Sequence, residues 1–371
     1  MVSVTATTAN FMPATVVITG GAGFIGGTLV RWLLARNPDL RVVTYDALTY
    51  AGNLESLAEV FTRHGARGDG RHFFVKGDIR DSVLFAATLN GEGRETGTER
   101  LIPRADAVIH LAAETHVDRS IMGPAPFITT NVVGTQVVLE CVRRTLDVAP
   151  RAFRMLHVGT DEVYGDLEPN DVPWTEEAPL KPSSPYAASK ASADHLVNAW
   201  HRTFDTPVLL TRCGNNYGPY QFPEKLIPLV ITRALVGATI PVYGDGMQIR
   251  DWIHAEDHAR ALWTVLRRGA LGRTYHVSAG DQRTNREVIT SILRQLDQPE
   301  SLMMRVTDRL GHDRRYALDN SRLTTELGWH AEHSWDQGIA DTVRWYQASR
   351  DWWGRVTSEA YRAAEALYLT A

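Results

Sequence analysis

Five side chains capable of proton transfer lie in one short stretch of the chain, and they are Thr160, Asp161, Glu162, Tyr186 and Lys190. The first three directly follow an apolar run, Phe153 to Val158, that is typical of a buried strand. Tyr186 and Lys190 are four residues apart in a segment that we expect to be helical, and side chains at that spacing share a helix face. Because a lysine cation favours the phenolate, the spacing predicts a tyrosine base with a lowered pKa beside a hydroxyl and two carboxylates.

A glycine-rich turn near the start of the chain predicts a dinucleotide site. Gly20, Gly23 and Gly26 lie between a β-branched run, Thr15 to Thr19, and an amphipathic pattern that predicts a helix to about Arg36. This order of strand, turn and helix is the context in which the glycine spacing becomes informative. Gly20 and Gly23 permit a tight turn and the close approach of a pyrophosphate, and Gly26 lets helix and strand pack closely.

The second predicted strand, residues 41–45, ends in Asp46, about twenty residues after the last glycine. A carboxylate there can accept the ribose hydroxyls of adenosine and would repel a 2′-phosphate, so the sequence predicts NAD rather than NADP. An ordinary turn with a capping aspartate is the alternative, and the glycines, the flanking elements and Asp46 together make it the weaker one.

Two further predicted strands deliver polar or small residues to the same edge. The strand at residues 72–75 leads to Asp78, which either faces an adenine or caps the helix that begins near Ser82. The strand at residues 107–111 leads to Ala112 and Ala113, whose small side chains let a cofactor lie against the backbone.

Two other segments are expected to carry no chemistry. His116 and Asp118 are interpreted as fixing their own loop by local hydrogen bonds. Residues 89–103 are glycine-rich and charged, which predicts a surface loop.

Composition excludes several classes of protein. The 371 residues are 44% hydrophobic and 22% charged, with a net charge of −4 and no dense run of Lys or Arg, so we expect no nucleic-acid partner and no membrane surface. The two cysteines, Cys141 and Cys213, cannot build a disulfide framework and favour a reducing, cytoplasmic location. Residues 1–30 carry no charge, but polar residues and Pro13 interrupt every apolar run, which predicts a flexible leader over residues 1–13.

Repeated strand-then-helix patterns predict an α/β fold with a doubly wound, parallel, Rossmann-type sheet. We expect an NAD-binding domain over residues 14–213 and, over residues 214–371, a smaller α/β lobe interleaved with the late sheet strands. Ligands bind at the carboxyl ends of such strands, where the five proton-transfer side chains are expected. The helices predicted at residues 127–146 and from Tyr186 onward are long enough to pair across a two-fold axis, which predicts a homodimer.

With these residues identified, the chain resembles the extended short-chain dehydrogenase/reductases, and among them the dTDP-glucose 4,6-dehydratases, over residues 15–346. The matching motifs are the glycine turn, Thr160-Asp161-Glu162, Tyr186 with Lys190, residues 215–226, Arg250-Asp251-Trp252 and residues 308–313. The resemblance implies NAD, a dTDP-glucose substrate, no metal, and loss of water from a hexose by oxidation at C4, elimination across C5 and C6, and hydride return to C6.

The resemblance also implies which side chains bind each ligand. The implied NAD contacts, together with the glycines and Asp46, are Phe24, Ile25, Thr49, Asp78, Ile79, Leu111, Ala112, Ala113, Thr115, Thr130, Tyr186, Lys190 and Asn216. The implied substrate contacts, besides Thr160, Asp161 and Glu162, are His116, Asn215, Lys225, Leu226, Pro241, Tyr243, Arg250, Asn285, Asp308, Arg309 and His312. Three departures from the family pattern are Gly159 in place of Ser, Leu310 in place of Pro, and the long loop at residues 89–103.

Other functions on the same scaffold remain as alternatives. A nucleotide-sugar 4-epimerase or decarboxylase uses the same tyrosine and the same transient ketone, but neither needs a proton donor aimed at C6. A catalytically silent NAD-binding regulator has no need for all five proton-transfer side chains. The pair of Asp161 and Glu162 favours the dehydratase over each of these.

Overall fold

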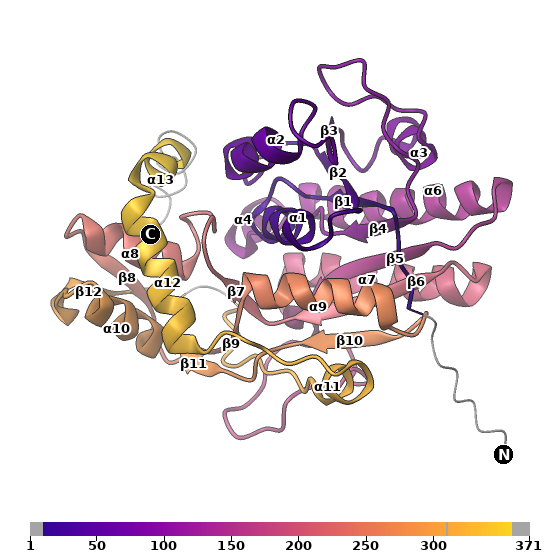
Figure 1. Cartoon of the computed structure of the whole chain (residues 1–371). Helices are drawn as coiled ribbons and strands as arrows, with labels where there is room; N and C mark the ends of the chain where they lie inside the picture. The colour runs from indigo at the N-terminus through magenta and orange to yellow at the C-terminus, as the bar shows by residue number, and fades with distance from the viewer. Residues whose placement is uncertain (1–9, 309–310, 358–371) are drawn as a thin grey trace.

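The largest element of the computed structural model, which describes residues 10–308 and 311–357, is a parallel sheet of seven strands (Figure 1). Its order is β10-β6-β5-β4-β1-β2-β3, and all neighbouring strands are parallel. The strands are β1 (Thr15–Thr19), β2 (Arg41–Asp46), β3 (His72–Lys76), β4 (Ala107–His110), β5 (Arg154–Thr160), β6 (Val208–Cys213) and β10 (Thr274–Val277). The chain reverses its direction of winding between β1 and β4, so the predicted doubly wound fold is confirmed.

Helices cover both faces of this sheet, and each face has its own hydrophobic core. One face carries α1 (Phe24–Arg36), η1 (Leu54–Leu57), α2 (Ala58–His64), α9 (Ala255–Arg268) and α11 (Ser321–Leu327). The other carries α3 (Ser82–Asn90), α6 (Thr135–Val148) and α7 (Pro185–Phe204). Cys141 and Cys213 are buried, free thiols in these two cores, as their number predicted.

A smaller lobe at one end of the sheet is built from later parts of the chain (Figure 1). It contains two small sheets, with strand orders β11-β9-β7 and β12-β8, and a third apolar core. Its elements are β7 (Asn215–Tyr217), α8 (Leu226–Leu235), β8 (Ile240–Tyr243), β9 (Ile249–His254), β11 (Gln282–Thr284), α10 (Asn285–Gln295), η4 (Glu300–Leu302), β12 (Met303–Val306), α12 (Trp335–Ala348) and α13 (Arg350–Val356). Between β9 and β11 the chain returns to the large sheet, where α9 packs on α1 and β10 pairs with β6.

The helix predicted at residues 127–146 is longer and less regular than its pattern indicated. It comprises α5 (Ala125–Phe127), a π-helical segment η2 (Ile128–Gly134) and α6, and it follows α4 (Val117–Met122). Within the described residues, the stretch Ala125–Val148 alone is long and apolar enough to cross a membrane, but it packs against α3 and α7. Packing against the neighbouring helices therefore explains why this helix is long and apolar.

The chain termini lie partly outside the described residues. Of the predicted leader, Phe11 packs against the core and its N–H donates to the Arg267 carbonyl at 2.9 Å, so the end of the leader is attached to the domain. Arg309 and Leu310, expected near the substrate, also lie outside the described residues.

The segment predicted as a surface loop at residues 89–103 protects the open edge of the sheet. The Thr96 N–H donates to the Phe74 carbonyl on β3 at 2.8 Å, and the Glu95 carboxylate accepts the Phe74 N–H at 3.3 Å. Glu95 is buried and also accepts from Arg100, whose guanidinium lies 3.8 Å over the Phe73 ring. Since an uncovered edge strand can pair with another chain, this loop removes a site of aggregation.

Replacing Glu95 by Ala is expected to lower the free energy of unfolding by about 2 kcal/mol, because it leaves the partly buried Arg100 guanidinium and the Phe74 N–H of the edge strand without their acceptor. Chemical denaturation measures this loss, and light scattering during refolding should show more aggregation. Glu99→Ala is the matched control in the same loop, since its carboxylate is 92% exposed and its pairing with Arg94 contributes at most about 1 kcal/mol. Equal losses for both variants would contradict the edge-protecting role.

Candidate functional site

Two adjoining cavities lie at the carboxyl ends of the sheet strands. The larger, of about 640 Å³, runs from the glycine turn to Tyr186 and Lys190, and we call it the long cleft. The smaller, of about 240 Å³, lies in the C-terminal lobe around Arg250 and Tyr243, and we call it the side pocket. Seven residues line both: Thr115, Glu162, Asn215, Asn216, Gln221, Glu224 and Lys225. A ligand bound in the long cleft and a second ligand bound in the side pocket would therefore meet at this shared wall, to which Glu162 belongs.

The glycine turn is shaped as its spacing predicted. Gly20 has a φ of +70°, and a Cβ there would lie 2.8 Å from the backbone N of Ala112. A Cβ on Gly26 would lie 2.1 Å from the Gly20 carbonyl oxygen, so neither position accepts a side chain. The helix α1 begins directly after Gly23, with its first N–H groups at the wall of the cleft. Backbone N–H groups at a helix N-terminus suit a pyrophosphate, so this turn fits a dinucleotide.

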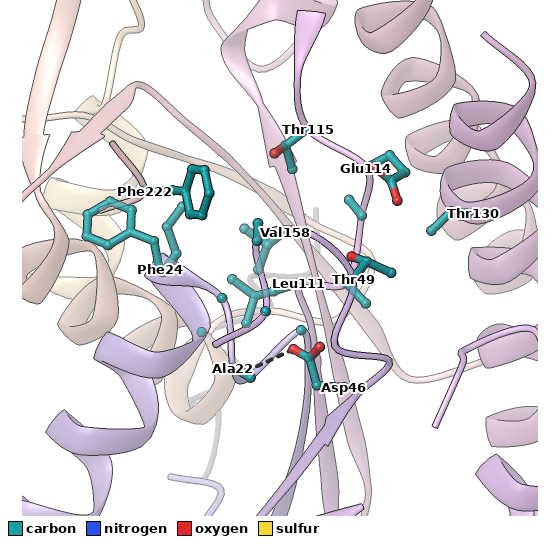
Figure 2. A pocket seen from close by; sticks show the side chains of 18 of the residues that line it. Ala22, Phe24, Asp46, Thr49, Leu111, Glu114, Thr115, Thr130, Val158 and Phe222 are labelled. Carbon is teal, nitrogen blue, oxygen red and sulfur yellow. Dashed lines mark hydrogen bonds between the residues drawn. The ribbon is translucent and has the colours of Figure 1, made fainter. Parts of the chain in front are cut away.

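Asp46 closes the same end of the cleft (Figure 2). Its carboxylate accepts the N–H groups of Ala22 at 2.9 Å and Leu48 at 2.8 Å, which fix its orientation. Burial raises its pKa above the ordinary value, while these two N–H groups oppose that effect. A carboxylate has about four acceptor positions, so room remains for two ribose hydroxyls.

All residues expected to contact the cofactor line the long cleft. They are Gly20, Gly23, Phe24, Ile25, Gly26, Asp46, Thr49, Asp78, Ile79, Leu111, Ala112, Ala113, Thr115, Thr130, Tyr186, Lys190 and Asn216. The interpretation of Asp78 as a helix cap is wrong, because Asp81 caps α3 by accepting from Val83 and Leu84, whereas Asp78 pairs with Arg80 at 2.5 Å.

Thr160 is the last residue of β5, and Asp161 and Glu162 follow it in the short 3-10 helix η3 (Asp161–Tyr164), at the end of the strand as predicted. The Thr160 hydroxyl donates to Asp161 Oδ1 at 3.2 Å and accepts the Glu162 N–H at 3.4 Å. Asp161 is 3% exposed, and its Oδ2 has no hydrogen-bond partner among the described residues. Burial, with the Glu162 carboxylate adding to it, raises the pKa of Asp161 well above its usual value. Asp161, on the wall of the cleft, therefore keeps its proton to a higher pH than an ordinary aspartate does.

Tyr186 and Lys190 share one face of α7, but the predicted lowering of the tyrosine pKa is wrong for the protein by itself. Burial raises the pKa of Tyr186 well above its usual value, with Glu162 adding to the effect. The Lys190 ammonium instead donates to the Val158 carbonyl at 2.8 Å. The spacing predicted the shared face correctly but gave no information on where the lysine side chain finds its acceptor.

A buried ion pair behind β5 sets the environment of Lys190. Asp194, one turn further along α7, accepts from Arg212 Nε at 2.8 Å and lies 3.4 Å from His157 Nε2. Burial lowers the pKa of Lys190, and the Asp194 carboxylate opposes this. A Cβ on Gly159 would lie 3.1 Å from Asp194 Oδ1, so the absence of a side chain at this departure from the family pattern makes room for the carboxylate.

The side pocket collects most residues expected to bind the substrate. The expected residues that line it, or the adjoining wall of the cleft, are His116, Thr160, Asp161, Glu162, Asn215, Lys225, Leu226, Pro241, Tyr243, Arg250, Asn285 and His312. Asp308 lines neither cavity. It accepts from Gln248 at 2.9 Å and pairs with His312 at 2.6 Å, so it supports His312 rather than facing a ligand.

Arg250 is held ready for an anion in this pocket. Its guanidinium donates to the carbonyls of Ile249 at 2.7 Å and Asp313 at 3.0 Å, and lies 4.2 Å over the Tyr316 ring. Lys225 is on the wall that the two cavities share, and its ammonium donates to the Thr115 carbonyl at 3.4 Å. His116 accepts the Arg119 N–H at 3.4 Å and so caps α4, consistent with its interpretation as a loop-fixing residue.

Several residues in or behind the cavity walls were not predicted as site residues from the sequence. Tyr316 stacks on Arg250, and Tyr220 and Trp352 line the long cleft from the C-terminal part of the chain. Asn131 is buried in η2 and fixes the backbone of Glu114. Its Oδ1 accepts the Glu114 N–H at 2.8 Å, and its Nδ2 donates to the Glu114 carbonyl at 3.0 Å. Of these, only Asn131 left a signal in the sequence, as a polar residue inside an aliphatic helix pattern.

The chain is similar along almost its whole length to proteins of known activity. A family model described as GDP-mannose 4,6 dehydratase matches residues 17–342. A dTDP-glucose 4,6-dehydratase of Xanthomonas campestris pv. campestris (strain B100) is 50% identical over 362 residues, covering 94% of this chain and 97% of the relative. The dTDP-glucose 4,6-dehydratase 1 of Escherichia coli (strain K12) is 47% identical over 367 residues, with the same coverage.

Solved structures agree with these relatives. The dTDP-glucose 4,6-dehydratase DesIV of Streptomyces venezuelae, solved with NAD bound, has a TM-score of 0.83 and 46% identity, covering 92% of this chain and 99% of that chain. The UDP-glucose 4-epimerase of Thermus thermophilus, solved as a complex with NAD, has a TM-score of 0.77 and 27% identity, covering 90% of this chain and 99% of that chain.

The raised pKa of Asp161 predicts a specific dependence of stability on pH. Below about pH 4 the carboxyl is protonated in both the folded and the unfolded chain; above it the unfolded chain ionises while the folded chain disfavours the charge. The stability contributed by the protonated form is thus lost as pH rises toward the folded pKa. Asp161→Asn is expected to be increasingly stable relative to wild type from pH 4 to pH 8, as measured by thermal unfolding. The exposed Asp147→Asn should show no such trend, and a constant difference for Asp161→Asn would contradict the assignment.

Proposed function

The chain belongs to the dTDP-glucose 4,6-dehydratases, and from that membership we propose that it converts dTDP-glucose to dTDP-4-keto-6-deoxyglucose and water with NAD as its resident cofactor. One observation carries the proposal. The buried acid Asp161 lies between Thr160 and Glu162, and Glu162 lies where the dinucleotide cleft and the anion-holding side pocket adjoin. That arrangement supplies a proton donor and a base for adjacent carbons of one sugar.

The first step is oxidation at C4 of the hexose. Tyr186 removes the proton of the C4 hydroxyl, and Thr160 hydrogen-bonds the oxygen as the ketone develops. Bound NAD supplies the redox chemistry, as hydride acceptor from C4 and later hydride donor to C6. Burial opposes ionisation of the phenol by raising the pKa of Tyr186, and a hydrogen bond with Thr160 acts in the opposite direction.

Elimination follows because the C4 ketone makes the C5 proton acidic. Glu162 removes that proton, while Asp161 transfers its own proton to the C6 hydroxyl, which leaves as water. Neighbouring side chains project in different directions, so the two carboxyl groups can address two carbons. After hydride return to C6, a proton added back at C5 completes the 4-keto-6-deoxy sugar.

The side pocket is proposed to hold the nucleotide part of the substrate. Lys225, Arg250 and His312, with Arg309 from outside the described residues, supply donors for a diphosphate. Within this proposal, residues 14–213 form the NAD-binding domain and residues 214–371 supply most of the substrate-binding lobe. A cytoplasmic location, and the lack of nucleic-acid and membrane partners, remain predictions from composition.

The alternative activities need less than this site provides. A 4-epimerase of the same fold needs the tyrosine and the ketone but no acid directed at C6, and the same holds for a decarboxylase. A silent NAD-binding regulator needs neither Asp161 nor Glu162. The buried Asp161, whose pKa is raised by burial, therefore favours the dehydratase.

We also propose that the protein is a homodimer paired through η2, α6 and α7 of each subunit. In η2, the side chains of Ile128 and Val133 are about half exposed. On α7 the exposed positions include Ala188, Ser192 and Ala199, which repeat at helical spacing and are small enough for close approach of another helix. Two such faces related by a two-fold axis make a four-helix contact.

Incubation of the purified protein with dTDP-glucose is expected to give a product lighter by one water, as detected by mass spectrometry. Tyr186→Phe should reduce the initial oxidation at C4 by at least about 100-fold. Asp161→Asn should permit that oxidation, seen as absorbance of reduced nicotinamide, but slow release of the dehydrated product by about 100-fold or more.

Asp171→Asn, on an exposed loop away from both cavities, is the control and should behave as wild type. An isomeric product would favour the epimerase, loss of carbon dioxide from a uronic acid the decarboxylase, and unchanged substrate the silent regulator. Wild-type product release by Asp161→Asn would exclude Asp161 as the acid.

Introducing charge on the proposed dimer face should produce monomers. Val133→Glu with Ile128→Glu is expected to shift the sedimentation coefficient from dimer to monomer, because buried charges without partners oppose association. Val172→Glu is the control, since Val172 is 82% exposed on a distant loop. A wild-type protein that sediments as a monomer at micromolar concentration would contradict the proposed pairing.

A further inference from the structure

One wall of the long cleft is aromatic and comes from the C-terminal lobe. Tyr220 and Trp352 both line the cleft. The Tyr220 ring lies 4.5 Å from the ring of Trp345 and 5.6 Å from that of Trp352, and the two tryptophans lie 5.1 Å apart. We call Tyr220, Trp345 and Trp352 the aromatic clasp. Figure 2 places Phe222, which follows closely after Tyr220, on the opposite side of the cleft from Glu114 and Thr130.

Tyr220 adopts a backbone conformation that bulky residues avoid. Its φ is +68°, and only Leu48, Asp205 and Asp297 share a positive φ among the non-glycine residues that the structure describes. Such a conformation persists only where the surroundings impose it, and it is concentrated at ligand clamps and other functional sites. Tyr220 combines this conformation with a place in the wall of the cleft.

The clasp joins the two lobes on either side of the cleft. Arg31 of α1 lies 4.1 Å over the Tyr220 ring and donates to the Ser56 carbonyl at 2.7 Å. Arg355 of α13 pairs with Glu55 of η1 at 3.0 Å. Figure 1 shows α13 continuing from α12 at the edge of the C-terminal lobe, and this ion pair attaches it to the NAD-binding domain. Each contact is modest alone, but together they connect α1 and η1 to α13 across the cleft mouth.

The proposed reaction gives such a closure a purpose. The hydride taken from C4 must return to C6 of the same sugar, so a cofactor that leaves between the two transfers strands a ketone and ends the cycle. On the basis of the proposed function, we propose that Tyr220 and Trp352, fastened by the Glu55–Arg355 ion pair, retain NAD in the cleft through the whole catalytic cycle.

The first test removes the clasp ring without straining the backbone. Tyr220→Asn suits the left-handed conformation and should fold, since Asn adopts it more readily than Tyr. The purified holoenzyme is placed in buffer with an NAD-consuming trap, and remaining bound NAD is quantified by chromatography after acid release. The dissociation rate constant of NAD is expected to rise about tenfold, the loss of an aromatic and a cation–π contact. Trp353→Phe, on the same helix but outside the cleft lining, is the control and should retain NAD like wild type.

The second test reverses the ion pair. Arg355→Glu is expected to raise the dissociation rate about threefold, and Glu55→Arg combined with Arg355→Glu should restore it. Arg344→Ala breaks an exposed pair within α12 and should change nothing.

A folded Tyr220→Asn variant that releases NAD at the wild-type rate would overturn the proposal. If Tyr220→Asn does not fold, the charge reversal decides, and its failure to restore the wild-type dissociation rate would overturn the proposal. Neither measurement uses substrate, so a failed clasp leaves the dehydratase proposal intact. A wild-type protein inactive toward dTDP-glucose, together with faster NAD loss in these variants, would count against the dehydratase alone.

Discussion

Keeping the Asp161 carboxyl out of water is the constraint on which the site depends. An acid that must protonate a sugar hydroxyl at neutral pH needs its proton held well above the pH where carboxyls normally lose it, and burial is the means this fold uses. Burial is possible because Asp161 follows directly from the buried strand β5, an interior strand of the sheet, rather than lying on a peripheral loop. Its Oδ2 atom accepts no hydrogen bond from any described residue, and leaving this buried oxygen unpaired lowers the stability of the fold. Such a loss of stability is typical of a group selected for reactivity.

Other buried charges near β5 are compensated, which makes the contrast informative. Asp194 and Arg212 neutralise each other, and their pair supports the charge on Lys190 from behind the strand. Arg250 rests on two carbonyls and an aromatic face. The site therefore combines charged groups that have partners of opposite charge or carbonyl acceptors with a buried acid, Asp161, whose Oδ2 accepts no hydrogen bond from the described residues. Asp194 Oδ1 and Glu224 Oε2 share that property, so the raised pKa of Asp161 reflects its burial and the nearby Glu162 carboxylate.

The parallel, doubly wound sheet and most of the lining were predictable from the sequence, because strands, glycine turns and the Tyr–Lys spacing are local patterns with local physical causes. The long cleft contains every expected cofactor residue for this reason. Asp78 was undecided because two aspartates precede α3 and only the backbone angles select Asp81 as the cap. The acceptor of Lys190 was missed because a carbonyl of β5 carries no sequence signal. Tyr316, Tyr220 and Trp352 were missed because they reach the cavities from distant parts of the chain, through packing between lobes that no spacing rule describes.

The return of the chain to the large sheet at α9 and β10 limits how this protein can be divided. β10 pairs with β6 along its whole length, and α9 packs on α1. A fragment ending at Cys213 would expose β6 as a free edge and uncover the apolar side of α1, even though it contains every residue that holds the dinucleotide turn. Neither lobe can therefore be exchanged between relatives as one continuous segment, because recombination would have to transfer two separate segments together. New sugar specificities on this scaffold should instead arise by point substitutions in the walls of the side pocket.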